Sequence, residues 1–172
     1  MDFLSLAKKR YSARKYKQDK VEKEKLYKIL EAGRVAPTGA NRQPQRIIVA
    51  NDSESLNRLS KAANIFDAPL ALIICCDTSE TWQRSFDGKK LTDIDASIVT
   101  DHMMLQSTDL GLGSVWICRF KADILKEEFN IPEHIEPVNI LAIGYADCDE
   151  ASPNRHANVR KPIENTVFYG KL

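Results

Sequence analysis

Features that mark several large classes of proteins are missing from this chain of 172 residues. No stretch approaches the roughly 20 consecutive apolar residues that a membrane-spanning helix needs. The segment 1–7 holds only a brief apolar run before Lys8 and Lys9, whereas a secretory signal peptide needs a longer one. We therefore expect a cytoplasmic protein with no membrane attachment.

Cysteine is scarce, and its spacing fits neither a metal site nor a redox motif. The four cysteines form no C-x-x-C pair, and the three histidines show no ligand spacing with them. We therefore expect no bound metal. Buried, reduced thiols are typical of such cysteines in a cytoplasmic protein, and we expect this state for Cys75, Cys76, Cys118 and Cys148.

The chain also lacks a marked charge excess and the usual nucleotide-binding loops. Lysine and arginine total 25 against 24 acidic residues, which leaves a net charge of +1 and argues against a nucleic-acid binder. No G-x-G-x-x-G follows a strand pattern, and no G-x-x-x-x-G-K-[ST] is present. Gly111 and Gly113 follow a helical pattern, so they indicate a helix end and a tight turn.

What the chain does have is the composition of an ordinary globular protein, with 43% hydrophobic and 28% charged residues. Its length predicts one domain, residues 1–172, that buries roughly 70% of its unfolded surface. Hydrophobic periodicity predicts helices over 20–36, 53–62, 93–110 and 122–129, with Asp52 or Ser53 capping the second. It predicts strands over 46–50, 69–76, 114–118 and 138–145. This order indicates an α+β fold, a sheet wrapped by helices.

The most distinctive local feature is the sequence Arg10-Tyr11-Ser12-Ala13-Arg14, within a segment that also carries several lysines. A guanidinium group is well suited to grip phosphate, and two of them flank a serine here. A basic helix end followed by a solvated loop is the alternative, and this segment alone leaves both open. The near-neutral total charge favours one small anion over a polyanion.

Three further segments complete a pattern with 10–14, namely 36–44 (APTGANRQP), 110–118 (LGLGSVWIC) and 160–164 (RKPIE). In this order and spacing they resemble the nitroreductase family of FMN-dependent oxidoreductases, over nearly the whole chain. The chain departs from the family pattern in carrying one hydroxyl group in the second segment. It also has Gln45 where a tryptophan is usual, and Cys118 and Arg119 where small residues are usual. We expect these changes to affect substrate range more than cofactor binding.

The resemblance implies a central, mainly antiparallel sheet wrapped by helices, in a homodimer whose subunits exchange their C-terminal arms. It implies FMN as the cofactor, bound at the subunit interface. In the family the first and last motifs hold the FMN phosphate, which here points to Arg10 and Arg160. Tyr11 and Ser12 would contact the phosphate, ribityl chain or ring edge. Arg14 would lie near the pyrimidine end, where a positive charge stabilises reduced flavin.

The resemblance assigns the two middle motifs to the flavin ring. A loop of the second subunit would cover the cofactor through Pro37, Thr38, Gly39 and Asn41. The other flank of the ring would be lined by Trp116, Ile117, Cys118 and Arg119, with a backbone N–H near the cysteine bonded to flavin N5. Taken alone, the first of these segments is typical of a helix-ending turn and the tryptophan of a core side chain.

The implied reaction is ping-pong: NADH or NADPH reduces FMN, and a flat, electron-poor acceptor such as a nitroaromatic or quinone then reoxidises it. Related flavin chemistry (dehalogenation, enone reduction or flavin breakdown), a flavin carrier or sensor without turnover, and nucleic-acid binding through residues 8–17 remain as alternatives. Since the flavin performs the chemistry, we expect no catalytic side chain.

Several other residues have no predicted role at the site. We expect Asp95 and His102, on the long helix 93–110, to be structural rather than catalytic. We expect Arg34, Arg84 and Arg155 on the surface, where an ion pair contributes little. The apolar tail 162–172 is predicted to dock on its own domain or on a partner subunit.

Overall fold

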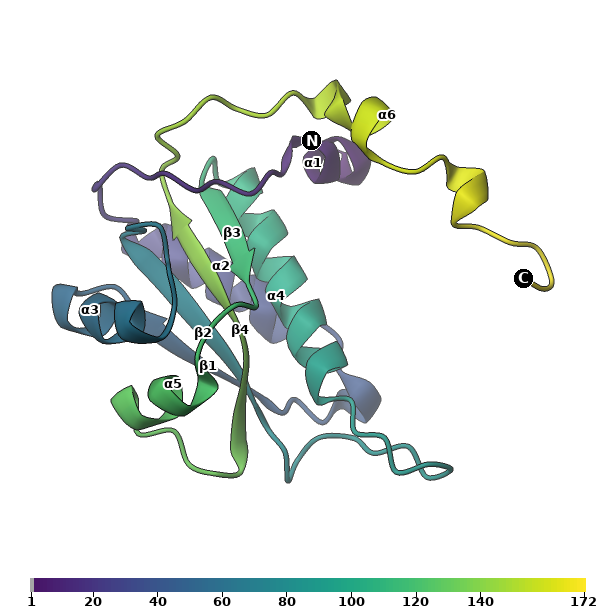
Figure 1. Cartoon of the computed structure of the whole chain (residues 1–172), viewed down its shortest axis with the longest axis horizontal. Helices are drawn as coiled ribbons and strands as arrows, with labels where there is room; N and C mark the ends of the chain where they lie inside the picture. The colour runs from purple at the N-terminus through teal and green to yellow at the C-terminus, as the bar shows by residue number, and fades with distance from the viewer. Residues whose placement is uncertain (1) are drawn as a thin grey trace.

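The computed structural model describes residues 2–172 and contains a four-stranded antiparallel sheet with helices on both faces (Figure 1). Its strands are β1 (Gln45–Ala50), β2 (Leu70–Asp77), β3 (Gly113–Ile117) and β4 (Ile135–Gly144). They are ordered β1-β2-β4-β3, and each neighbouring pair is antiparallel. The predicted α+β architecture and all four predicted strands are confirmed, with β4 beginning earlier than expected.

Two pairs of helices cover the two faces of the sheet. The first pair is α2 (Lys23–Val35) and α4 (Thr92–Asp109), and the second is α3 (Ser53–Ala62) and α5 (Ala122–Glu128). Leu72 of β2 belongs to the apolar cluster beneath α2 and α4, whereas its neighbour Ile73 belongs to the cluster beneath α3 and α5. Because successive side chains of a strand point to opposite faces, a strand covered on both sides must be apolar throughout.

The ends of the helices follow the expected local chemistry. The Asp52 side chain accepts hydrogen bonds from the backbone N–H groups of Glu54 and Ser55, and the Asp52 backbone N–H donates to Ser55 Oγ, which completes a capping box. Gly111 lies directly beyond the end of α4 with φ of 77°, a conformation that glycine adopts without strain. The predicted helix starting at residue 20 begins at Lys23 instead.

A segment near the N-terminus runs along the free edge of β3. It follows α1 (Phe3–Lys9), a helix that the apolar pattern does not predict. Ser12 pairs in parallel with Ser114, and the Ala13 backbone N–H donates to the Ser114 carbonyl at 3.0 Å. The buried Tyr16 hydroxyl donates to the Ala13 carbonyl at 2.8 Å. These bonds hold the basic segment 10–14 beside β3.

The C-terminal segment leaves the sheet and ends far from it (Figure 1). It contains η2 (Pro153–Arg155), α6 (His156–Val159) and η3 (Ile163–Asn165). Every residue of 157–172 is exposed, including the apolar side chains of Ile163, Phe168 and Tyr169. The tail therefore does not dock on its own sheet, which removes one of the two predicted alternatives. Throughout residues 2–172, each helix is too short or too polar to cross a bilayer.

The cysteines divide into two groups. Cys75 and Cys76 are buried in β2 and unpaired, as predicted, and burial raises the pKa of each thiol to about 12. The prediction is wrong for Cys118 and Cys148, which are exposed. The strand β3 ends at Ile117, so Cys118 lies just beyond the strand that was predicted to bury it. Cys148 lies in the polar segment that follows β4.

Gly113 is the position that permits the close approach of the N-terminal segment. A Cβ added there would lie 2.8 Å from Ala13 Cβ and 3.0 Å from Ala146 Cβ, and neither neighbour can rotate away. We expect Gly113→Ala to lower the free energy of unfolding by about 1–3 kcal/mol, the usual cost of overpacking. Urea denaturation followed by circular dichroism measures this change.

Gly33→Ala is the matched comparison. Its added Cβ would approach Met103 Sδ at 2.9 Å, which is the flexible part of a side chain, and alanine favours the helix by roughly 0.5–1 kcal/mol. We expect a clearly smaller loss of stability. Equal losses in the two variants would contradict a rigid contact between Ala13 and β3.

Candidate cofactor site

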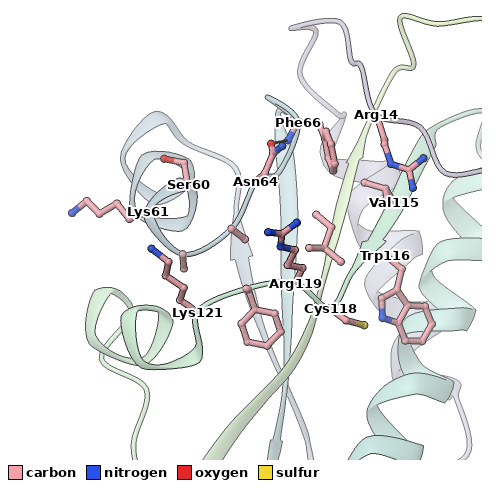
Figure 2. Close-up of a pocket in the computed structure, with 14 residues that line it drawn as sticks. Arg14, Ser60, Lys61, Asn64, Phe66, Val115, Trp116, Cys118, Arg119 and Lys121 are labelled. Carbon is pink, nitrogen blue, oxygen red and sulfur yellow. Dashed lines mark hydrogen bonds between the residues drawn. The ribbon is translucent and has the colours of Figure 1, made fainter.

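A pocket of about 590 Å³ opens beside β3 on the face covered by α3 and α5. Its walls come from Arg14, from residues 60–64 and Phe66 around the end of α3, and from residues 115–121, which include the end of β3 and the loop that follows (Figure 2). Three aromatic side chains, Phe66, Trp116 and Phe120, line it together with four basic ones. The pocket thus combines flat apolar walls with positive charge, which suits a planar molecule that carries negative charge.

The end of β3 supplies one wall of this pocket. Ile117 is buried, Trp116 is half-buried, and Cys118 and Arg119 are exposed. The indole Nε1 of Trp116 and the hydroxyl of Ser114 are buried without a hydrogen-bond partner among residues 2–172. Trp116 packs against the apolar cluster beneath α2 and α4, so its unpaired N–H lies on the opposite side of β3 from α3 and α5.

Arg14 reaches the pocket through the pairing of Ser12 with Ser114. Its guanidinium group points toward the pocket from above the end of β3 (Figure 2). No ion pair or side-chain hydrogen bond involves Arg14 within residues 2–172. Tyr11 points elsewhere, into a smaller cavity of about 230 Å³ that also contains Cys148. Burial, reinforced by that thiol, raises the pKa of Tyr11 to about 12.

A second concentration of positive charge lies at the other end of the N-terminal segment. Arg10 is half-buried, and its pKa is lowered, first by burial and then by the charges of Arg155 and Arg160, with Asp101 acting in the opposite direction. Like charges repel, so a bound anion would stabilise such a cluster. The effect of the Arg160 charge on Arg10 shows that the structure brings these two residues together, although they lie at opposite ends of the sequence.

Arg155 is the residue that the sequence analysis missed. The prediction of a surface position is wrong, because the side chain is half-buried and donates to the carbonyls of Lys8 at 3.0 Å, Ser152 at 2.9 Å and Arg10. These bonds tie the C-terminal segment to the end of α1. Arg34 and Arg84 are exposed, as predicted, and each pairs with a nearby carboxylate on its own segment.

The arginines as a whole fall into two groups. One group has partners within the chain: four arginines pair with carboxylates, Arg34, Arg46, Arg58 and Arg84, while Arg155 bonds carbonyls. In the described part of the chain the others have no ion pair and no side-chain hydrogen bond. These are Arg10, Arg14, Arg42, Arg119 and Arg160. All of them lie in or directly beside the four segments 10–14, 36–44, 110–118 and 160–164.

The loop Pro37–Asn41 lies away from the pocket in this chain, since none of its residues lines it. The loop is held by Asp95, whose carboxylate accepts the Gly39 N–H at 2.8 Å and is only 1% exposed. It includes η1 (Gly39–Asn41), and Ala40, Asn41 and Gln43 have φ near +50°, which is strained for residues other than glycine. Strain that the surrounding structure maintains is common at binding sites.

The other candidates for catalysis are placed elsewhere. Asp95 anchors that loop, and the Nδ1 atom of His102 lies 2.9 Å from the Ile98 carbonyl. Neither residue lines the 590 Å³ pocket. Within residues 2–172 no cluster of three or more His, Cys, Asp and Glu side chains is placed to hold a metal ion.

The sheet order, the edge segment beside β3 and the pocket together define a nitroreductase fold. The sequence model of the Nitroreductase family matches residues 7–66 and 59–145. The chain therefore belongs to the Nitroreductase family.

Individual relatives agree with this assignment. A nitroreductase family protein from Clostridium difficile 630 is 59% identical, with a TM-score of 0.98 and 100% of both chains covered. An FMN-dependent nitroreductase from Clostridium difficile R20291 is 31% identical, with a TM-score of 0.83, over 99% of this chain and 100% of that one. A Methanothermobacter thermautotrophicus protein, provisionally named NADH dehydrogenase/NAD(P)H nitroreductase, is 33% identical over 153 residues, which are 84% of this chain and 78% of that protein.

Loss of the Arg155 side chain should loosen the C-terminal segment. Hydrogen bonds from a charged donor contribute about 1.5–3 kcal/mol, and partial exposure reduces this, so we expect Arg155→Ala to destabilise the local contact by about 1–2 kcal/mol. Amide hydrogen exchange over residues 8–10 and 151–160 should become roughly tenfold faster. Arg34→Ala, which removes an exposed ion pair, should leave these rates unchanged. Unchanged exchange rates in both variants would show that the Arg155 hydrogen bonds do not hold the C-terminal segment in place.

Proposed function

We propose that this chain is a single-domain, FMN-dependent oxidoreductase that uses NADH or NADPH to reduce flat, electron-poor acceptors such as nitroaromatics and quinones. The observation that carries the proposal is the division of arginines that lack a carboxylate partner between two places. Arg10, Arg155 and Arg160 form one cluster, and Arg14 stands at the aromatic pocket, with a single edge segment joining the two. FMN has this same division, a phosphate at one end and a planar ring at the other.

The residues present fit FMN on the structural evidence. Burial first, and then the charges of Arg155 and Arg160, lower the pKa of Arg10. A phosphate there would offset both effects and gain charge-assisted hydrogen bonds from the cluster. The ring would lie along residues 116–119 at the end of β3, in the pocket lined by Trp116. Two relatives, one called an FMN-dependent nitroreductase and one called an NADH dehydrogenase/NAD(P)H nitroreductase, support the same cofactor and electron donors.

FMN, when bound, supplies the redox chemistry by accepting a hydride and passing electrons to the acceptor. The protein's share is to bind, orient and tune it. The positive charge of Arg14 favours the anionic reduced form of a ring held against it, which raises the reduction potential. Tyr11 and Ser12 belong to the edge segment that carries Arg10 and Arg14. The aromatic walls exclude water and select flat molecules.

We further propose that the functional unit is a homodimer in which each subunit completes the site of the other. In one chain, the strained loop that contains Pro37, Thr38, Gly39 and Asn41 is absent from the pocket wall. A cavity of about 760 Å³ among α1, α2 and α4 is lined by both apolar and charged residues, and the aromatic side chains of Phe3 and Tyr27 there are 70% exposed. The apolar tail of residues 163–172 is exposed as well. A partner subunit would cover both surfaces.

The decisive experiment is spectroscopic. Purified protein incubated with FMN and desalted should be yellow, should lose its visible absorbance when NADH or NADPH is added anaerobically, and should recover it when a nitroaromatic or quinone follows. Parallel lines in double-reciprocal plots would establish the ping-pong order. A protein that takes up no FMN would refute the proposal, and a flavin that neither nicotinamide can bleach would indicate a carrier.

Variants of the cation cluster test the assigned phosphate site. Each charge-assisted contact contributes about 1.5–3 kcal/mol, so Arg10→Ala and Arg160→Ala should each weaken FMN binding by roughly tenfold to a hundredfold. Arg58→Ala, which removes an arginine paired with Glu54 on α3, is the matched control and should bind FMN normally. Full FMN affinity in both cluster variants would show that the phosphate lies elsewhere.

Light scattering tests the dimer. The full chain loaded with FMN should have about twice the 19.4 kDa mass of one chain. Deletion of residues 163–172 removes several exposed apolar side chains that each gain roughly 1.5–3 kcal/mol when buried, so the dissociation constant should rise by more than about tenfold. A monomeric full chain that nevertheless binds FMN would contradict the shared site.

A further inference from the structure

We propose that the end of the pocket formed by Lys61, Arg119 and Lys121 is an anion subsite that binds the negatively charged group of a substrate. This inference rests on the proposed function, because it concerns what reacts at that pocket. The bound group would be a carboxylate, sulfonate or phosphate. Its source is either the phosphates of the nicotinamide dinucleotide or an acidic substituent on the electron acceptor.

The first support is the charge of the pocket wall. Four basic side chains line it, and no aspartate or glutamate does. This local excess occurs in a chain whose 25 basic and 24 acidic residues almost cancel. Low-dielectric walls strengthen the field of such a one-signed cleft and raise the local concentration of oppositely charged molecules.

The second support is the lack of internal partners. Among residues 2–172, neither Arg119 nor Lys121 has an ion pair or a side-chain hydrogen bond. Lys61 is partly neutralised, because its Nζ lies 2.6 Å from Glu128 Oε1. Arg119 and Lys121 therefore supply the uncompensated charge, and Lys61 stands beside them. Isolated surface cations are often unpaired, but these two lie next to each other on the wall of a pocket.

The third support is that the backbone carrying these cations is held in place. The Lys121 N–H donates to the Ala62 carbonyl at 3.0 Å, and Ala63 forms a β-bridge with Phe120. Lys121 also occupies the position directly before α5. The loop after β3 is thus fixed to the end of α3 on one side and to α5 on the other. Preorganised charges cost less entropy when a ligand binds.

The fourth support is that the proposed cofactor contacts leave these cations available. FMN would use the Arg10 cluster for its phosphate and Arg14 for its ring. Arg119 is assigned to the flank of the ring and not to the phosphate, and neither Lys61 nor Lys121 is assigned a cofactor contact. In Figure 2, Arg14 and Trp116 lie at one side of the pocket and Lys61 and Lys121 at the other, with Arg119 between them. A substrate lying across this wall would extend an acidic group toward Arg119 and Lys121. Arginine is well suited to bind such a group with two parallel hydrogen bonds.

The test uses FMN-loaded protein and two probes of the same shape, 4-nitrobenzoate and uncharged 4-nitrobenzamide. Binding to the oxidised protein is measured from the perturbation of the flavin spectrum, and kcat and KM are measured separately. We compare the wild type, Arg119→Gln, Lys121→Gln and the double variant. Lys20→Gln, which removes one exposed charge outside every pocket described above, is the matched control.

If the acceptor carries the anion, each single variant should weaken the binding of 4-nitrobenzoate relative to that of 4-nitrobenzamide by about fivefold or more. This change should appear in Kd and KM rather than in kcat. If the dinucleotide carries it, the acceptor ratio stays constant, and the apparent Kd of NADH or NADPH in anaerobic flavin reduction should rise by about the same factor. Either shift should shrink as ionic strength rises. Both outcomes support the subsite and identify the source of its ligand.

The subsite is refuted by a double variant that keeps FMN and shows no change in binding. In that case the ratio of 4-nitrobenzoate to 4-nitrobenzamide affinity and the apparent Kd of NADH or NADPH would both stay within about twofold of the wild type and of Lys20→Gln. That result leaves the proposed function intact, because the protein would still bleach with NAD(P)H and reduce the neutral probe. Failure of the proposed function is distinct, since the wild type itself would then carry no reducible flavin. If Arg119→Gln loses FMN, Lys121→Gln decides the question alone.

Discussion

The site depends on one backbone contact, the pairing of the segment after α1 with the free edge of β3. Ser12 pairs with Ser114, and Gly113 lets Ala13 approach without a steric clash. Because of this contact, the basic segment 10–14 connects the arginine cluster with the pocket at the end of β3. Arg10 reaches the cluster near the C-terminal segment, while Arg14 reaches the pocket at the end of β3.

Charge is distributed unevenly over this nearly neutral chain, and the arginines without partners lie at the motif segments. Arginines outside the four motif segments have partners within the chain, whereas those in or beside the motifs have none in residues 2–172. The pKa of Arg10 is lowered first by burial and then by the charges of Arg155 and Arg160. An anionic cofactor and an anionic substrate would each relieve part of this repulsion.

Much of the fold could be predicted because its signals are local. The capping box at Asp52 and the continuous apolar run of β2 each depend on neighbouring residues, and the structure agrees with both. The role of Arg155 could not be predicted, because its partners are the carbonyls of Lys8 and Arg10, 147 and 145 positions away. Backbone carbonyls occur at every residue and leave no signal in the sequence. The exposure of Cys118 depended on where β3 ends, which local patterns define poorly.

The sequence by itself determined the four strands, the four helices that cover the sheet, the α+β class and the four motifs whose resemblance indicated the family. Hydrophobic periodicity and short motifs act over a few residues, so they can be recognised without a structure. Only the tertiary structure decided that Arg155 joins Arg10 and Arg160, that loop 37–41 lies away from the pocket, and that Arg119 and Lys121 share a wall with Arg14. Those relations join segments far apart in the chain, and only packing of the helices on the sheet brings them together.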